Sequence, residues 1–260
     1  MTTLDLGDNQ IEEISGDDFG SLKSLYGLKL AGNKIQKLGN DTFSNASNLH
    51  ILNLARNNLE TIDHGTFANQ QELIVLRLDD NSLTDANGIV SGLNRLEWLN
   101  ISSNRLEWFD YAFVPSSLQW LDMSRNHIGE LGNFYNLKSL DKLRTIKASH
   151  NLISKIDVNS FQAVSMSLAN IDLSNNLISY VGPNTFADLK SLVSAMLKNN
   201  LIEHLERDAL ATAFPIEDGN TASVYFSGNP LICDCKLGWI QKINAEAEEA
   251  QLARRSHFNR

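Results

Sequence analysis

The sequence predicts an α/β repeat solenoid, in which each short coil of the chain adds one strand to a continuous parallel sheet. Two observations predict it. The pattern L-x-x-L-x-L-x-x-N recurs along nearly all of the 260 residues, and in five coils a phenylalanine follows the asparagine by ten positions. Self-similarity at a fixed period of 20–50 residues is typical of repeat architectures. The repeat therefore determines the fold class before any local feature is considered.

The asparagine at the ninth position is the most regular feature of the repeat. Ten of them follow one another at spacings of 22 to 29 residues, which predicts about ten coils. Each stands where the chain turns away from its strand, so its amide side chain can bond the backbone of neighbouring coils. Leaving a buried backbone group unpaired costs roughly 1–3 kcal/mol. We therefore expect a ladder of hydrogen bonds from the asparagine side-chain amides. The asparagines are Asn9, Asn33, Asn57, Asn81, Asn104, Asn126, Asn151, Asn176, Asn200 and Asn229.

Alternation along each strand predicts which side chains are buried. Positions 1, 4 and 6 of the repeat point inward, as Leu49, Leu52 and Leu54 do, and successive strands stack about 4.8 Å apart. Positions 3, 5, 7 and 8 point outward and form the sheet face, the concave side of the predicted horseshoe. On the opposite side we expect the phenylalanines to stack into a spine: Phe19, Phe43, Phe67, Phe161 and Phe186.

Some repeats depart from the pattern. Ala148 replaces the leucine of position 6, and Ala195 replaces the leucine of position 4. The repeat that follows Asn81 is short and lacks the phenylalanine. The segment from Leu210 to Ser223 carries an insertion, which we expect to form a loop on the convex or lateral side.

Charge and hydropathy exclude several classes of partner. The net charge is −9 and the pI is about 5.1, which argues against nucleic-acid binding and against a polybasic membrane patch. No run of 18 or more apolar residues is present, so no membrane span is expected within the chain. The first five residues do not read as a secretion signal, because they lack a basic region followed by an apolar stretch.

Catalytic and metal-binding patterns are missing from the sequence. The six histidines are scattered over different repeats and faces, and none lies beside a Ser or Cys partner in a predicted pocket. The two cysteines, Cys233 and Cys235, are too close in sequence to pair readily with each other, and no Cys/His cluster surrounds them. We therefore expect no enzyme activity, no cofactor and no metal.

One apolar strip runs across the predicted sheet face. Four consecutive third positions would place large apolar side chains side by side over about 15–20 Å. Exposed aromatic groups of this kind mark interaction sites. The alternative is that the tryptophans pack on each other and only stabilise the sheet. The residues of this apolar strip are Ile51, Val75, Trp98 and Trp120.

Polar side chains flank the apolar strip at positions 5 and 7. Arg77, followed by Asp79, is the nearest polar pair, and Asp122 stands beside Trp120 on the same strand. Together with the apolar strip, these three residues form the predicted partner-binding site.

Three sequons provide candidate glycosylation sites. Asn40 and Asn45 fall on the far side of their coils, where a glycan would not affect the sheet face. Asn100 stands beside Trp98, so a glycan there would cover the apolar strip. Binding would then move to a lateral face or to the convex loops.

The segment from Gly228 to Ile240 resembles the cysteine-flanked C-terminal cap of extracellular leucine-rich-repeat proteins, G-N-P-x-x-C-D-C-x-x-x-W-[LI]. In this family the strands line a horseshoe. The resemblance implies that Cys233 and Cys235 belong to a four-cysteine, two-disulfide cap whose second pair is absent from this chain. The expected organisation is leucine-rich repeats over residues 1–226, cut at the N-terminal end and without a cap there, and a truncated C-terminal cap over residues 227–260.

Residues 104–115 (N-R-L-E-W-F-D-Y-A-F-V-P) and 118–122 (L-Q-W-L-D) resemble the insect Toll receptors, especially the long, Tollo-like members. The resemblance implies an ectodomain fragment of a single-pass receptor on the extracellular face of the plasma membrane, with its membrane segment outside this chain. Its implied partners are a cystine-knot cytokine of Spätzle type or another cell-surface receptor, with pairing into homo- or heterodimers. Chaoptin-like and Slit-like adhesion or guidance proteins share the cap and remain the alternative.

Overall fold

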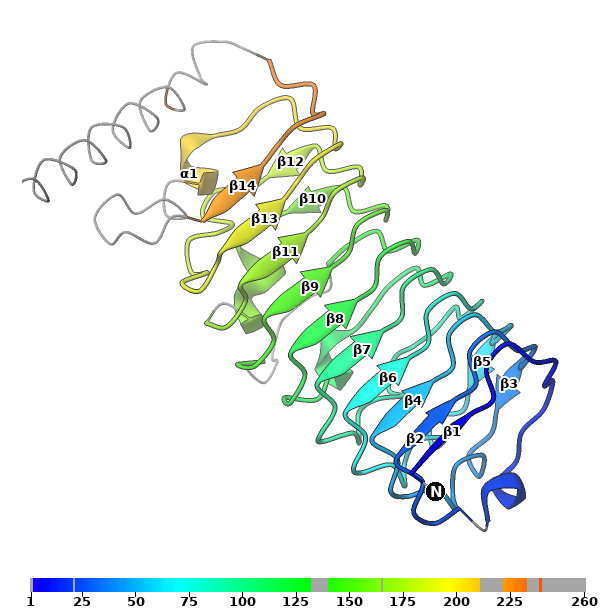
Figure 1. Ribbon diagram of the computed structural model, residues 1–260. Coiled ribbons are helices and arrows are strands. Elements are labelled where there is room, and N and C mark those ends of the chain that lie inside the picture. Colours follow the sequence, from blue (N-terminus) through cyan, green and yellow to red (C-terminus); the bar gives the residue numbers. More distant parts are fainter. Residues whose placement is uncertain are drawn as a thin grey trace, which may run out of the picture.

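The computed structural model describes residues 2–20, 22–131, 140–164, 166–210, 222–232 and 239. Within this part of the chain, ten three-residue strands form one parallel sheet that runs the length of an elongated solenoid (Figure 1). The strands of this sheet follow one another in chain order, so each coil lies beside the coil that precedes it. The predicted leucine-rich-repeat solenoid with its parallel sheet is confirmed.

The strands begin at position 3 of each repeat and end at position 5. Equal positions of neighbouring coils pair, so that Val75 lies opposite Trp98 and Trp98 lies opposite Trp120. The ten strands are β1 (Thr3–Asp5), β2 (Gly27–Lys29), β4 (Ile51–Asn53), β6 (Val75–Arg77), β7 (Trp98–Asn100), β8 (Trp120–Asp122), β9 (Thr145–Lys147), β11 (Asn170–Asp172), β13 (Ser194–Met196) and β14 (Ser223–Tyr225).

The other elements are short and lie outside this sheet. Two-residue strands pair on the return side of the coils, β3 (Lys37–Leu38) with β5 (Thr61–Ile62) and β10 (Lys155–Ile156) with β12 (Tyr180–Val181). One turn of α-helix, α1, spans Arg207–Leu210, and 3-10 turns span Gly16–Phe19, Tyr111–Phe113 and Val158–Val164.

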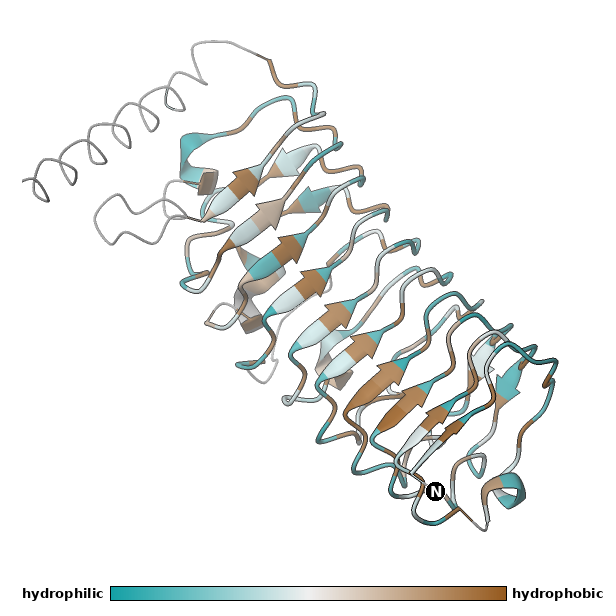
Figure 2. Cartoon of the chain, viewed as in Figure 1, coloured by the Kyte–Doolittle hydropathy of each residue, from teal (hydrophilic) through white to brown (hydrophobic). Residues whose placement is uncertain are grey.

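The core is a continuous column of apolar side chains from positions 1, 4 and 6. Leu49, Leu52 and Leu54 are fully buried, as the alternation predicts. Ala148 and Ala195 are also fully buried, so the weak repeats keep the same inward register. Figure 2 shows apolar and polar residues alternating along the coils, in the strands and in the segments between them. No single coil can bury its own apolar face, so stability depends on the contacts between neighbours.

The amide ladder is present from Asn33 to Asn229. In a typical rung, Asn57 Oδ1 accepts a bond from the Ile35 amide at 3.1 Å, and Nδ2 donates to the carbonyls of Leu30 and Leu54 at 2.9 and 3.0 Å. The same three bonds recur at each later ladder asparagine. Each of these asparagines thus forms hydrogen bonds with the backbone of its own coil and with the backbone of the preceding coil.

The turn before each ladder asparagine has a left-handed residue. Position 8 has a positive φ in every coil, between 53° and 57° wherever the residue is not glycine. This region is unfavourable for side chains other than Asn, Asp and His, yet Arg56 and Arg125 occupy it as well as His150. The contacts of the ladder hold these residues in place. Their conformation also projects the position-8 side chains away from the core, and all three are exposed.

The phenylalanine spine is confirmed in two segments. Phe43 stacks between Phe19 and Phe67, with ring centroids 6.1 and 5.9 Å away, and Phe161 stacks on Phe186 at 6.0 Å. Between the two segments the spine is replaced by other apolar groups. One is an edge-to-face pair formed by Phe109 and Tyr111, whose centroids lie 5.3 Å apart. Burial raises the pKa of the Tyr111 hydroxyl above its usual value.

Two predicted features fall largely outside the described residues. Residues 211–221 of the insertion predicted between Leu210 and Ser223 lie outside the described residues, and α1 stops at Leu210 while β14 starts at Ser223. Cys233, Cys235 and most of the predicted cap at 227–260 are likewise outside. Trp239 is described: its Nε1 donates to the Leu205 carbonyl at 3.2 Å, and the indole packs against the core. The boundary between the repeats and the cap, placed between residues 226 and 227, stays a prediction.

Candidate partner-binding face

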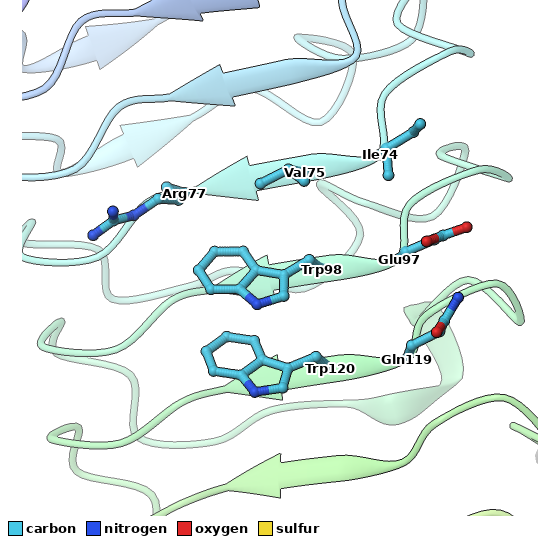
Figure 3. A pocket seen from close by; sticks show the side chains of 7 residues that line it. All are labelled: Ile74, Val75, Arg77, Glu97, Trp98, Gln119 and Trp120. Atoms are coloured by element: carbon cyan, nitrogen blue, oxygen red, sulfur yellow. The ribbon is translucent and has the colours of Figure 1, made fainter.

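A pair of stacked tryptophans lies near the middle of the sheet face. Parallel pairing of β7 and β8 places Trp98 beside Trp120, and their rings lie almost parallel, with centroids 4.2 Å apart and 5° between planes. Both side chains are half-buried. Figure 3 shows the two indoles in the same orientation, leaning along their strands toward Arg77. The pair forms a rigid aromatic feature.

The rest of the apolar strip continues from Trp98 toward the N-terminal coils. Val75 is half-buried, and Ile51 is 40% exposed. The structure therefore brings together the four residues that the column of third positions predicted. It also shows that the tryptophans pack on each other. The binding role of the strip stays a prediction.

The two ends of the tryptophan stack differ. On the β9 side, the Lys147 ammonium lies over the Trp120 ring, 5.3 Å from its centroid. On the β6 side, the small side chain of Val75 leaves an open depression of about 370 Å³ next to Trp98. Figure 3 shows the residues that line it: Ile74, Val75, Arg77, Glu97, Trp98, Gln119 and Trp120.

Arg77 and Asp79 form a two-point ion pair at the edge of this depression. Arg77 Nε and Nη2 donate to the two carboxylate oxygens of Asp79 at 2.9 and 2.7 Å. Asp79 is buried, whereas Arg77 is partly exposed. The hydrogen bonds to Asp79 raise the pKa of the Arg77 guanidinium, and the nearby charge of Asp80 contributes to the same shift. Only Arg77 of this pair presents much surface to a partner.

Fifth-position side chains bind their own backbone, a role that sequence analysis missed. Asp122 Oδ1 accepts a bond from the Ser124 amide at 2.9 Å, and Asn100 Oδ1 accepts one from the Ser102 amide at 3.0 Å. Asx turns of this kind were predictable from residue type, since Asp and Asn commonly bond the amide two residues on. Asp5, Asn53 and Asp172 make the same bond.

The three sequons differ in exposure. Asn40 and Asn45 are exposed on the far side of the coils, as expected. Asn100 is only 9% exposed, because its side chain folds into the turn after β7. Glycosylation at each of the three positions stays a prediction, but the burial of Asn100 disfavours a glycan beside Trp98.

A second exposed apolar column lies on the lateral edge of the solenoid. The residue directly after the ladder asparagine is polar in the first six coils, but in three later coils it is a leucine that is 45–50% exposed. The signal was present in the sequence, since reading the tenth position as a column would have found it. We refer to Leu152, Leu177 and Leu201 as the lateral column.

The described residues show neither a metal-ligand cluster nor a membrane-spanning helix. In this part of the chain, no group of three or more His, Cys, Asp and Glu side chains could hold a metal ion. Among the same residues, no helix is long and apolar enough to cross a membrane.

Stacked coils, a parallel sheet, an amide ladder and a phenylalanine spine define a leucine-rich-repeat protein whose sheet face is open to solvent. Residues 1–54, 47–106, 141–202 and 166–212 match the leucine rich repeat family, and the chain belongs to that family.

The chain is also similar to Toll-like receptor 7 of Drosophila melanogaster. The two are 48% identical over 244 residues, which is 94% of this chain. The resemblance to the leucine-rich-repeat region of an insect Toll receptor is therefore confirmed over almost the whole chain. The chain spans 17% of the length of that receptor.

Solved structures share the fold. The leucine-rich repeat domain of APL1B covers 88% of this chain, and the chain covers 65% of it, with 25% identity and a TM-score of 0.74. An octameric complex of Latrophilin 3, Unc5D and FLRT2 contains a chain that covers 93% of this one and is 79% covered by it, with 23% identity and a TM-score of 0.69.

Proposed function

We propose that this chain is an extracellular protein-recognition segment of a Toll-type transmembrane receptor that acts in innate immune or developmental signalling. The similarity to an insect Toll-like receptor over 94% of the chain supports the receptor class. The stacked pair Trp98–Trp120 on the open sheet face is the observation that carries the binding role.

The physical reason is that this pair suits the centre of a protein interface. Binding energy concentrates in a few large side chains, most often Trp, Tyr and Arg, and the surrounding contacts mainly exclude water. Stacking already fixes both indoles, so little side-chain entropy is lost when a partner covers them. Ile51 and Val75 extend the apolar area, and Arg77 provides a polar contact at its edge.

The partner is a folded protein outside the cell. A cystine-knot cytokine of Spätzle type or another cell-surface receptor fits a Toll-type ectodomain, and receptor pairing into homo- or heterodimers follows from the same class. In this proposal, attachment to the membrane uses a segment outside this chain.

The experiment compares binding variants on a biosensor. This chain is immobilised and exposed to a panel of purified Spätzle-type cytokines and cell-surface receptor ectodomains. Trp98→Ala with Trp120→Ala is expected to weaken the strongest interaction by about 30-fold or more, since hot-spot truncations cost roughly 2 kcal/mol or more. The melting temperature should change little, because the core is untouched.

Trp108 provides the matched control, because it is 54% exposed and lies outside the strands of the sheet face. Trp108→Ala should leave the affinity unchanged. If Leu177→Ser with Leu201→Ser abolishes binding while the tryptophan pair is dispensable, the lateral column is the site and the sheet-face proposal is wrong. A membrane adhesion protein as the strongest ligand would favour a chaoptin- or Slit-like adhesion role instead.

A further inference from the structure

We propose that the open face of Trp98 receives an aromatic side chain of the partner, preferably tyrosine, which adds a third ring to the tryptophan stack. This inference rests on the proposed function, since it assigns the chemistry of the group that the sheet face binds. Three features of the structure carry it: the unequal ends of the stack, the fixed spacing of the sheet, and the surroundings of the open end.

The stack has room for another group at one end. On the β9 side the Lys147 ammonium lies over the Trp120 ring, 5.3 Å from its centroid. On the β6 side Val75 lies opposite Trp98, and its side chain is too short to cover the indole. The depression of about 370 Å³ lies on this side. Since pockets of roughly 300–1,000 Å³ hold whole small ligands, a single side chain of a partner fits there.

The spacing of the sheet suits a flat group in this place. Equal positions of neighbouring strands lie about 4.8 Å apart. The indoles of Trp98 and Trp120 follow this spacing and stack with their centroids 4.2 Å apart. A third ring above Val75 would lie at about the same separation from Trp98 and would continue the column in register. Offset stacking of aromatic rings contributes attraction beyond the burial of their area, which an aliphatic side chain of the same size lacks.

The surroundings of the open end favour an uncharged group. Figure 3 shows the Glu97 side chain directed away from the indoles, so its carboxylate does not face the Trp98 ring. A cation on the ring would therefore have Arg77, a like charge, as its nearest charged neighbour. A carboxylate would find the Arg77 guanidinium already matched by the two bonds to Asp79. A neutral ring avoids both costs and covers the apolar surface of Val75.

Tyrosine fits the open end better than phenylalanine. Both indoles lean toward Arg77, so a ring stacked on Trp98 in the same orientation would direct its far edge toward the guanidinium (Figure 3). Asp79 accepts from Nε and Nη2 of Arg77, and no acceptor among the described residues bonds Nη1. The Arg77 side chain is 42% exposed. Its Nη1 group is therefore available to donate to the oxygen of a phenol.

A small probe tests the ring site without an identified partner. N-acetyl-tyrosine N-methylamide is added to the ¹⁵N-labelled chain, and NMR follows the indole Nε1–H signal of Trp98 and the ring protons of the probe. We expect saturable shifts, with the probe protons moving upfield because they enter the ring current of the indole. The phenylalanine analogue should bind about two- to ten-fold more weakly, as expected for the loss of one hydrogen bond.

The cyclohexylalanine analogue has a similar apolar volume without an aromatic ring and should bind more weakly than both. The absence of a saturable shift, equal binding of the cyclohexylalanine analogue, or stronger binding of the arginine analogue would overturn the inference. Equal binding of the tyrosine and phenylalanine analogues would reject the hydrogen bond from Arg77.

Val75→Tyr fills the open place with a ring of the chain itself. It should abolish the probe shift and reduce partner affinity as much as the tryptophan double variant does, because the third position of the stack is taken. Ser194→Tyr adds the same side chain at the equal position of β13, away from the stack, and should change neither. Thermal melts confirm that both variants fold. Unchanged partner affinity in Val75→Tyr, with binding lost in the tryptophan double variant, would reject the ring site and leave the proposed function standing.

Discussion

At the residue scale, the ladder asparagines hold the coils together through three hydrogen bonds each. Asn126 Oδ1 accepts from the Leu106 amide at 3.0 Å, and its Nδ2 donates to the carbonyls of Ile101 and Met123, both at 3.0 Å. An amide fits because it offers an acceptor oxygen and two donor hydrogens, whereas a hydroxyl has only one hydrogen to donate. Asp could accept the first bond but could not donate the others.

Replacing Asn126 with Ala should lower the free energy of unfolding by about 3 kcal/mol, because buried backbone groups lose their partners. Asn9 is the matched control. It lies at the end of the ladder, is exposed, and among the described residues its side chain bonds only to its own coil, at Leu6 and Gly7. Asn9→Ala should cost less than about 1 kcal/mol. Urea denaturation measures both values. Equal losses in the two variants would show that the hydrogen bonds between coils contribute no stability.

Residue type predicts some of these roles and not others. The ladder asparagines could be predicted from their spacing, because an asparagine at the same position of every coil can bond the backbone groups of the turns. The left-handed conformation of Arg56 and Arg125 could not, since this residue type does not favour it. The structure imposes it through the turn that the ladder closes. The burial of Asn100 was also missed, because alternation alone assigns position 5 to the outside.

At the element scale, the phenylalanine spine stabilises the return side of the coils. Phe43 is fully buried and stacks on a phenylalanine of each neighbouring coil. Phe43→Ala should reduce the free energy of unfolding by about 3–5 kcal/mol, because truncation leaves a cavity. Phe43→Leu keeps most of the volume and should cost clearly less. Thermal or urea unfolding checks both, and similar small losses for Ala and Leu would argue that the spine is not closely packed.

The strands and their register followed from the sequence, whereas the arrangement of side chains on them did not. A fixed repeat places equal positions side by side, so the neighbours of Trp98 could be named in advance. The nearly parallel stacking with Trp120 and the position of Lys147 over the ring depend on side-chain rotamers. The break of the spine after Phe67 was visible as missing phenylalanines. The pair Phe109–Tyr111 in the gap was not predictable from the repeat.

At the scale of the whole molecule, the solenoid presents an open sheet face, and we expect that no N-linked glycan covers it. In protein secreted from insect cells, glycopeptide mass spectrometry is expected to find glycans at Asn40 and Asn45, which are exposed, and none at Asn100, which is 9% exposed. High occupancy at Asn100 would contradict the sheet-face site, because the glycan would cover Trp98. The chain order of the strands made the overall fold predictable, but the partner depends on a surface that the repeat leaves free to vary.

The most direct test is hydroxyl-radical footprinting of the tryptophans with and without the strongest ligand from the binding panel. Mass spectrometry then reports the oxidation of each indole separately. Binding at the sheet face predicts that Trp98 and Trp120 become protected together, while Trp108 is oxidised to the same extent in both samples. Protection of Trp108 or of the lateral column, with Trp98 and Trp120 unchanged, would contradict the account.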